Sequence, residues 1–174
     1  MLRDIAIVGV GCIGFKSITP DMSYKEIMFE AATKAYEDAG VNPRKDIDAF
    51  VTCAEDYWEG YSIFDEFVPD QLGAALRHLF TVSADGLYGL ATAYMLIRTG
   101  ELDVIAVEAH SKASDMLTFA DIVAFALDPI FNRPLGGHPY YIAGLEMTRF
   151  LHETGNTKEQ CAQVVVKNKR NALK

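Results

Sequence analysis

The sequence predicts an α/β protein with a mostly parallel sheet, and three observations lead to this fold class. Two apolar runs, residues 5–10 (IAIVGV) and 103–111 (DVIAVEAHS), lack the alternation of a half-exposed strand and are typical of strands buried on both faces. Stretches with helical spacing of apolar residues separate the expected strands. Strand and helix therefore alternate along the first two thirds of the chain, an order that implies right-handed crossovers between parallel neighbours.

The first expected strand leads through a loop into a long helix and a second strand. Glycine, threonine and proline break the chain between residues 11 and 20. Apolar residues at helical spacing predict a helix over Ser23–Ala39, and Gly40 is placed to end it as a C-cap. A further apolar run predicts a strand over Ala49–Cys53. The aromatic and acidic stretch at residues 56–67 is expected to be a loop.

The middle and end of the chain continue this alternation and then depart from it. A helix around Asp70–Leu79 is expected to precede a short strand at Phe80–Val82, and the next helix is predicted over Ser83–Arg98. The stretch Ser111–Tyr141 is rich in proline and glycine, so we expect an excursion from the core. Two helices close the chain, and the second begins with the capping-box sequence TKEQ at residues 157–160.

Composition narrows the class of protein. With 174 residues, 50% hydrophobic and 23% charged, the chain has an ordinary globular composition and enough length for one sizeable core. A net charge of −8 argues against nucleic-acid binding. No apolar run is long enough to cross a bilayer, and the first residues lack the layout of a signal peptide. We therefore expect a cytoplasmic protein without a membrane span.

The cysteines and a basic stretch near the end give no strong functional signal. Cys12, Cys53 and Cys161 are scattered, so neither a disulfide framework nor a metal site is predicted. The basic sequence KNKRNALK at residues 167–174 falls in the last turns of the final helix, where its charges complement the helix dipole. The alternative interpretation is a patch for a phosphorylated ligand or a partner subunit.

Gly9, Gly11 and Gly14 spell GxGxxG directly after the first expected strand, a pattern that can cradle the pyrophosphate of a dinucleotide. Such a cradle needs a helix that starts at the last glycine, whereas Pro20 and polar residues precede the helix here. The acidic residue that would bind the ribose comes late, at Glu55. We favour glycines that serve a tight exit from the strand, and no nicotinamide is expected.

Ser83 and His138 each have two interpretations. Ser83 stands between a short strand and a helix, where a side chain meets the positive end of the helix dipole and free backbone N–H groups. A serine needs a separate base to become a nucleophile, so spacing alone favours an N-cap. His138, in PLGGHPYY, is either a base on a tight turn or, more typically, a surface or packing residue. The other histidines fall in ordinary helix or strand contexts: His78, His110 and His152.

Four stretches together resemble the N-terminal half of thiolases, most closely the archaeal and sterol-carrier-type branch of acetyl-CoA acetyltransferases and lipid-transfer proteins. They are IAIVGVGCIGF, EAATKAYEDAGVNPRKDIDAFV, GLYGLATAYMLIRTGELDVIAVEAHSKASD and YYIAGLEMTRFLHETGNTKEQCAQVVVKNKRNAL. The unit TGELDVIAV followed by SKASD is the most specific. The resemblance implies a thiolase-like αβαβα layered fold with a mostly parallel mixed sheet. It also implies an incomplete core over residues 1–110, which lacks its last strand, and a largely helical loop-domain segment over residues 111–174.

In thiolases the nucleophilic cysteine heads the helix that precedes an SGEYD-like turn. Counting back from TGELD at residues 99–103, the resemblance places Ser83 at the position of this cysteine, so the nucleophile is replaced. Backbone N–H groups near Asp85 and Gly86 are expected to help hold a substrate thioester. The family's catalytic histidine belongs to the second half of a thiolase, so the GGHP sequence does not transfer that role to His138.

The resemblance implies coenzyme A thioesters as substrates, with no tightly bound cofactor and no metal. We expect an acyl-CoA-binding subunit of a complex that forms or cleaves carbon–carbon bonds, inactive by itself because the acid–base residues come from elsewhere. The alternatives are retro-aldol cleavage of a hydroxyacyl-CoA and a non-catalytic scaffold or lipid- and acyl-binding subunit. Thiolases pair through the strand before the nucleophile, so Phe80, Thr81 and Val82 are expected to form a dimer interface, homomeric or heteromeric. The missing C-terminal half is expected to come either from a second thiolase-like chain or from the rest of a longer protein.

Overall fold

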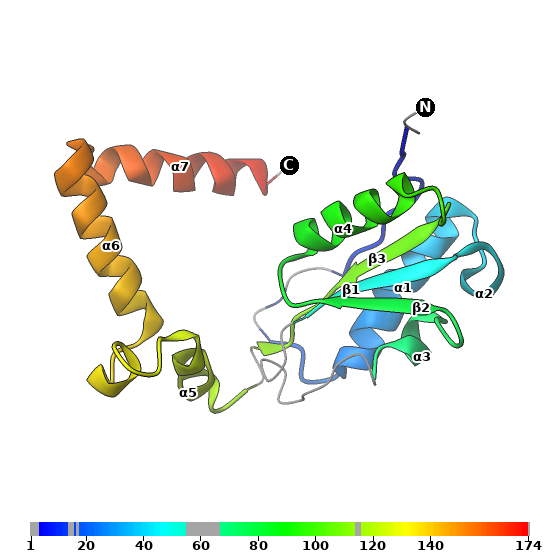
Figure 1. Ribbon diagram of the computed structural model, residues 1–174, viewed down its shortest axis with the longest axis horizontal. Coiled ribbons are helices and arrows are strands. Elements are labelled where there is room, and N and C mark those ends of the chain that lie inside the picture. Colours follow the sequence, from blue (N-terminus) through cyan, green and yellow to red (C-terminus); the bar gives the residue numbers. More distant parts are fainter. Residues whose placement is uncertain (1–3, 14–15, 17, 55–66, 114–115, 174) are drawn as a thin grey trace. The chain divides into compact units, whose positions relative to one another are not determined.

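The computed structural model describes residues 4–13, 16, 18–54, 67–113 and 116–173. The chain divides into two compact units, residues 1–119 and 120–174, which we describe separately. The first unit contains a sheet with helices on both of its faces, and the second is helical (Figure 1).

The first unit is built on a three-stranded sheet in which every strand is parallel to its neighbour. The strands are β1 (Ala49–Cys53), β2 (His78–Val82) and β3 (Ile105–Ala109). Their order is β2-β1-β3, so β1 is central, and all five of its residues are buried. The register aligns Cys53 with Val82 on one side and with Ala109 on the other. The predicted α/β class with a parallel sheet is confirmed.

Helix α1 (Tyr24–Ala39) covers one face of this sheet, and it confirms the helix predicted at this place. Ser23 and Glu26 form a capping box at its start, and Gly40 ends it in the left-handed conformation that glycine adopts most easily. Two of its buried residues, Tyr24 and Met28, belong to the hydrophobic core. The core continues into the sheet and the segment after it through Phe50, Ala54, Val68 and Leu72.

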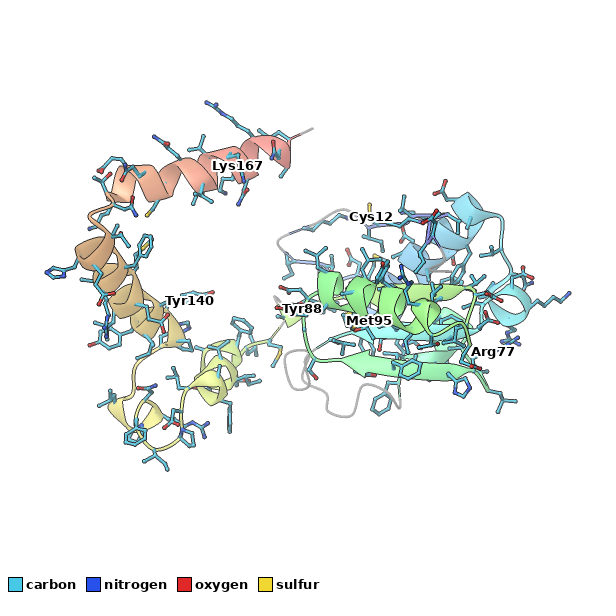
Figure 2. All side chains as sticks on the ribbon, turned by 45° about the horizontal axis from the view of Figure 1, so that its top comes forward. Cys12, Arg77, Tyr88, Met95, Tyr140 and Lys167 are labelled. Atoms are coloured by element: carbon cyan, nitrogen blue, oxygen red, sulfur yellow. The ribbon has the colours of Figure 1, made fainter. Side chains whose placement is uncertain are left out.

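Helix α4 (Gly86–Arg98) covers the opposite face (Figure 1). Gly89 lies against the side chains of Cys53, Val51 and Val107, leaving no room for a side chain of its own. The outward side of the helix is also apolar. Its exposed residues include Tyr88 and Met95, which Figure 2 labels, together with Leu87 and Tyr94. Because both of its sides are apolar, α4 has the composition of an interior helix.

The strand predicted at residues 5–10 is not observed, and that prediction was wrong. Residues 4–13 contain no strand, and Ile7 and Val8 are about two-thirds exposed, at 69% and 66%. The segment instead follows α1: the N–H of Val10 donates to Oδ2 of Asp38 at 2.9 Å. Gly9 and Gly11 lie so close to the backbone of α1 that added Cβ atoms would overlap it. Contact with the helix thus takes the place of strand pairing.

Two predicted helix boundaries also differ from the structure. The helix expected at Asp70–Leu79 is only one turn, α3 (Pro69–Leu72), because Gly73 follows in the left-handed conformation. Strand β2 then begins at His78, earlier than predicted. The helix expected from Ser83 begins at Gly86. A short helix, α2 (Pro43–Asp46), was not predicted. Of the loop expected at residues 56–67, all but Phe67 lies outside the described residues.

The second unit is largely helical. After α5 (Phe119–Val123) and two short 3-10 turns it contains α6 (Pro139–Thr154) and α7 (Lys158–Asn171). The predicted capping box at the start of α7 is confirmed: Thr157 and Gln160 cap each other's backbone N–H groups. Only Val123 and Leu127 are buried among the described residues of this unit. None of the helices in the described part of the chain combines the length and apolar character needed to cross a membrane.

Candidate active site at the carboxyl edge of the sheet

The carboxyl ends of the three strands meet at one edge of the sheet. Because Cys53, Val82 and Ala109 are aligned in register, the residues that follow them leave the sheet side by side. In open parallel sheets this edge is where ligands bind, since helix N-termini and loop residues gather there. The candidate site therefore comprises the side chains at these three strand ends.

Ser83 lies in the short connection between β2 and α4, where it is exposed. The connection is tight, because the N–H of Ala84 donates to the carbonyl of Val82 at 2.8 Å. The N-cap of α4 is Asp85, in extended conformation, so the interpretation of Ser83 as an N-cap is wrong. Ser83 is thus an exposed hydroxyl two residues before the helix.

Asp85 and Gly86 form the N-terminus of α4 beside Ser83. Asp85 makes no side-chain capping hydrogen bond, although its carbonyl accepts from the N–H of Tyr88 at 2.8 Å. Gly86 lies next to the end of β3, where an added Cβ would be 3.0 Å from the Cβ of Ala109. The first N–H groups of a helix have no partner within it, and they carry the positive end of its dipole. This positive end therefore lies at the carboxyl edge of the sheet.

A buried pair of ionisable side chains, Glu108 and His110, lies at the end of β3. Nδ1 of His110 is 3.0 and 3.1 Å from the two carboxylate oxygens of Glu108. Only 1% of the His110 side chain and 9% of the Glu108 side chain are exposed. The imidazole ring is stacked with the ring of Tyr24 from α1, at a centroid distance of 6.0 Å. The pair therefore lies on the face of the sheet that α1 covers.

The sequence interpretation missed this pair, because His110 was assigned to an ordinary strand context. A signal was present: residues two apart in a strand point to the same face, so Glu and His in VEAHS are neighbours by geometry. What the sequence alone could not give was their burial. That depends on α1, which lies about 80 residues earlier in the chain.

Cys53 also lies at this edge, but on the opposite face, beneath Gly89 of α4. Burial raises the pKa of the Cys53 thiol, and the negative charges of Glu108 and Asp85 raise it further, against a lowering hydrogen bond from the Gly89 backbone. Because the thiolate is the reactive form of cysteine, this buried thiol is a poor nucleophile. Cys53 is therefore a packing residue of the core.

The interface residues predicted from the resemblance lie on β2, which is an edge strand. Phe80 is 38% exposed, and Thr81 and Val82 follow it to the end of the strand. The hydroxyl oxygens of Thr81 and Thr52 are 3.3 Å apart, which links β2 to the central strand. In the described part of the chain no strand pairs with the outer side of β2, as pairing with a partner strand would require.

The remaining candidates lie away from this edge. His138 is the N-cap of α6: its Nδ1 accepts from the N–H of Tyr140 at 3.2 Å, and the residue is exposed. The basic residues at the end of α7 include Lys169 and Arg170 in its last turn, as the helix-dipole interpretation requires. Lys167 and Tyr140 mark these two helices in Figure 2.

A shallow groove of about 500 Å³ lies between α1, α2 and α3. Its walls are mainly apolar and include Phe29, Tyr36 and Leu72, with Glu37 and Arg44 at its polar side. No serine, cysteine or histidine lines it. Among the described residues, no cluster of three or more histidine, cysteine, aspartate or glutamate side chains is arranged to hold a metal ion. The carboxyl edge therefore remains the candidate active site.

Comparison with known proteins agrees with the resemblance that the sequence suggested. No family model matches the chain. The chain is 26% identical to an acetyl-CoA acetyltransferase of Methanothermobacter thermautotrophicus over 98% of its length and 45% of that protein. It is 24% identical to an acetyl-CoA acetyltransferase of Methanocaldococcus jannaschii over 99% of its length and 45% of that protein. The chain thus spans about half the length of the curated relatives it matches.

One solved structure aligns with about half of this chain. The 3-oxoacyl-[acyl-carrier-protein] synthase III of Aquifex aeolicus VF5 aligns with 52% of this chain and 31% of its own, with 20% identity and a TM-score of 0.44. The matches in sequence extend over nearly the whole chain, whereas this one covers half of it. The two sequence matches agree with the resemblance to thiolases: over nearly its whole length, this chain is similar to about half of an acetyl-CoA acetyltransferase.

Proposed function

We propose that this chain is the acyl-CoA-binding part of a thiolase-like complex that forms or cleaves carbon–carbon bonds, with Ser83 in the place of the usual nucleophilic cysteine. The observation that carries the proposal is the similarity to two acetyl-CoA acetyltransferases over 98% and 99% of the chain. The position of Ser83 supports it, because this exposed hydroxyl lies at the carboxyl edge beside the N-terminus of α4.

The chemistry of Ser83 suggests binding rather than covalent catalysis. An alcohol becomes a nucleophile only when an adjacent base removes its proton, whereas a thiol at a helix N-terminus is activated by the dipole alone. In our proposal the Ser83 hydroxyl and the N–H groups at Asp85 and Gly86 hold the carbonyl of a thioester. The helix dipole then favours the negative charge that develops on that oxygen.

The test is acetyl-CoA binding by the full chain, measured by titration calorimetry. Ser83→Ala should weaken binding by about 5- to 10-fold, the loss of about one hydrogen bond. Thr99→Ala removes an exposed hydroxyl at the C-cap of α4, the opposite end of that helix from Ser83, and should leave binding unchanged. Equal affinities for the wild type and Ser83→Ala would remove Ser83 from the site. No binding to the wild type would contradict the acyl-CoA function.

A second candidate is retro-aldol cleavage of a hydroxyacyl-CoA, which needs proton transfers and no acyl-enzyme. This candidate is favoured because neither possible nucleophile at the edge is activated. Ser83 is an alcohol, and the thiol of Cys53 is buried and has a raised pKa. Incubation with 3-hydroxyacyl-CoA thioesters should then release a shorter acyl-CoA and a carbonyl compound, without any acylated protein.

A non-catalytic scaffold or lipid- and acyl-binding subunit is the third candidate, and the large exposed apolar side chains favour it. Examples are Leu117, Phe131, Tyr140 and Leu173. An acyl adduct on Ser83, detected by mass spectrometry after incubation with acetyl-CoA, would exclude the scaffold. We also propose a dimer, homomeric or heteromeric, that pairs through β2. Sedimentation as a monomer at micromolar concentration would contradict the homomeric form.

A further inference from the structure

We propose that helix α7 of one copy of this chain docks into the groove between α1, α2 and α3 of a second copy. Neither surface takes part in the acyl-CoA function proposed above, and this contact is distinct from pairing through β2. Three observations support it: the exposed apolar and basic face of α7, the composition of the groove, and the opposite net charges of the two units.

Helix α7 is exposed along its whole length. Of its residues only Cys161 is partly covered, and Val164, Val165 and Val166 are 56%, 54% and 47% exposed. Exposed apolar side chains that are grouped in this way mark a surface where another molecule binds. A helix with so little packing of its own is therefore a candidate interaction element.

One face of α7 combines apolar side chains with a basic end. Residues spaced i, i+3, i+4 and i+7 share one side of a helix, and this spacing joins Ala162, Val165, Val166 and Lys169. Lys167, labelled in Figure 2, is two positions from Lys169 and therefore lies on the opposite side of the helix. A helix that presents apolar anchors at this spacing is suited to binding in a groove of another molecule.

The groove of about 500 Å³ between α1, α2 and α3 has the complementary composition. Its apolar walls include Leu72 and Phe29, and the Phe29 side chain is 59% exposed. Two exposed acidic residues, Glu37 and Asp70, line it together with one basic residue, Arg44. Within the described residues neither carboxylate takes part in an ion pair, so both can meet a basic side chain of a partner.

The net charges of the two units favour a second copy as the occupant of the groove. Residues 1–119 contain 9 Lys and Arg against 19 Asp and Glu, a net charge of −10, whereas residues 120–174 contain 7 against 5, a net charge of +2. The second unit of one copy is therefore attracted to the first unit of another, whereas two first units repel each other. Because every copy carries both surfaces, two reciprocal contacts close a dimer.

The first experiment is sedimentation velocity of the full chain over a roughly 100-fold range of protein concentration, at about 0.05 M and about 1 M NaCl. A reversible dimer should form at the lower salt concentration. It should be at least about 10-fold weaker at the higher one, because salt screens the charges of the two surfaces. A chain that stays monomeric at both salt concentrations would overturn the proposal. A dimer of equal strength at both, as pairing through β2 would give, would also overturn it.

A matched pair of variants tests the face of α7. Lys169→Glu should weaken the dimer by at least about 10-fold, because it places a negative charge against an acidic groove. Lys167→Glu makes the same change of charge two residues away on the opposite side of the helix, and it should associate like the wild type. Equal weakening by both variants would show that net charge alone drives association, and an unchanged dimer in Lys169→Glu would place the interface elsewhere. Either result would overturn the proposal.

The groove has its own test. Glu37→Lys should weaken the dimer as Lys169→Glu does, whereas Glu101→Lys, at an exposed position after α4, should not. Mixing the Lys169→Glu chain with the Glu37→Lys chain should restore a dimer. In that mixture the α7 of the Glu37→Lys chain and the groove of the Lys169→Glu chain are both unchanged, so one wild-type contact can form. A mixture that associates no better than the separate variants would overturn the proposal.

Discussion

Gly89 of α4 lies against Sγ of Cys53 at the end of β1, with no space between them for a Cβ atom. The contact sets how closely α4 approaches the sheet, and with it where the N-terminus of α4 lies at the carboxyl edge. The glycine thus connects the packing of the core with the geometry of the candidate active site.

Gly89→Ala should therefore lower the free energy of unfolding of the first unit by about 1 to 3 kcal/mol, the cost of overpacking a core. Gly144→Ala is the matched control, because Gly144 is also helical but no atom lies within 4 Å of an added Cβ. That change should raise helix stability by up to about 1 kcal/mol. Urea unfolding followed by circular dichroism measures both, and adding Cys53→Ala to Gly89→Ala should restore part of the loss.

A substitution at Leu76 is expected to raise the free energy of unfolding, in contrast to Gly89→Ala. Leu76 is the only described residue other than glycine with a positive φ, at 60°, and it is fully exposed. The left-handed conformation costs a residue with a Cβ about 1 to 2 kcal/mol, and glycine avoids this cost. Part of the gain is offset because glycine loses more conformational entropy on folding. Leu76→Gly should thus raise the free energy of unfolding by about 0.5 to 1 kcal/mol. Ala75→Gly, at the neighbouring position without a positive φ, should not.

Asp48 makes the stability of the sheet depend on pH. Backbone hydrogen bonds from Val104 and then Asp103, both 2.9 Å from Oδ2, hold the pKa of the Asp48 carboxyl below its ordinary value of 3.8. A pKa that is lower in the folded state contributes stability above pH 3.8, and this contribution is lost as the pH falls below that value.

Asp48→Asn should accordingly destabilise the protein at pH 7 and reduce its sensitivity to acid below about pH 4. Asp21→Asn changes an exposed carboxyl and is the control. Denaturant unfolding at pH 7 and pH 3 measures the difference. An acid sensitivity equal to that of the wild type would show that Asp48 is not a source of it.

Ser83→Cys should introduce a nucleophilic thiol at the candidate active site. A thiol close to a helix N-terminus has a lowered pKa, so it should be acetylated by acetyl-CoA, whereas the wild-type serine should not. Peptide mass spectrometry locates the adduct. Thr118→Cys places a second exposed thiol in the same unit as a control, and equal acetylation at both positions would mean that the edge does not activate the thiol.

Local sequence signals predicted the parts of the fold that depend on local structure. The start and end of α1 follow from Ser23, Glu26 and Gly40, whose capping interactions form within a few residues of each other. The capping box of α7 was predicted in the same way. Strand β1 was found from its apolar run because a central strand is buried on both faces.

Long-range packing decided the elements that the sequence did not predict. The run at residues 5–10 has the composition of a buried strand, but Gly9 and Gly11 let its backbone press against α1 instead. The first two glycines of the GxGxxG pattern, Gly9 and Gly11, therefore have a packing role that neither interpretation of the pattern included, and Gly14 lies outside the described residues. The helix expected from residue 70 ended early because Gly73 adopts the left-handed conformation that stops a helix. The buried pair of Glu108 and His110 was missed because burial by α1 cannot be read from VEAHS alone.

The apolar outward side of α4 has a practical consequence for work with the protein. Tyr88 and Met95 are 65% and 61% exposed, so they contribute little to the stability of the unit that carries them. Together they form an exposed apolar surface that favours association between molecules at high protein concentration. Tyr88→Lys combined with Met95→Lys should leave the melting temperature nearly unchanged, while light scattering of concentrated samples falls. The double variant would then remain unaggregated at the concentrations that spectroscopy needs, without a change to Ser83, Asp85 or Gly86.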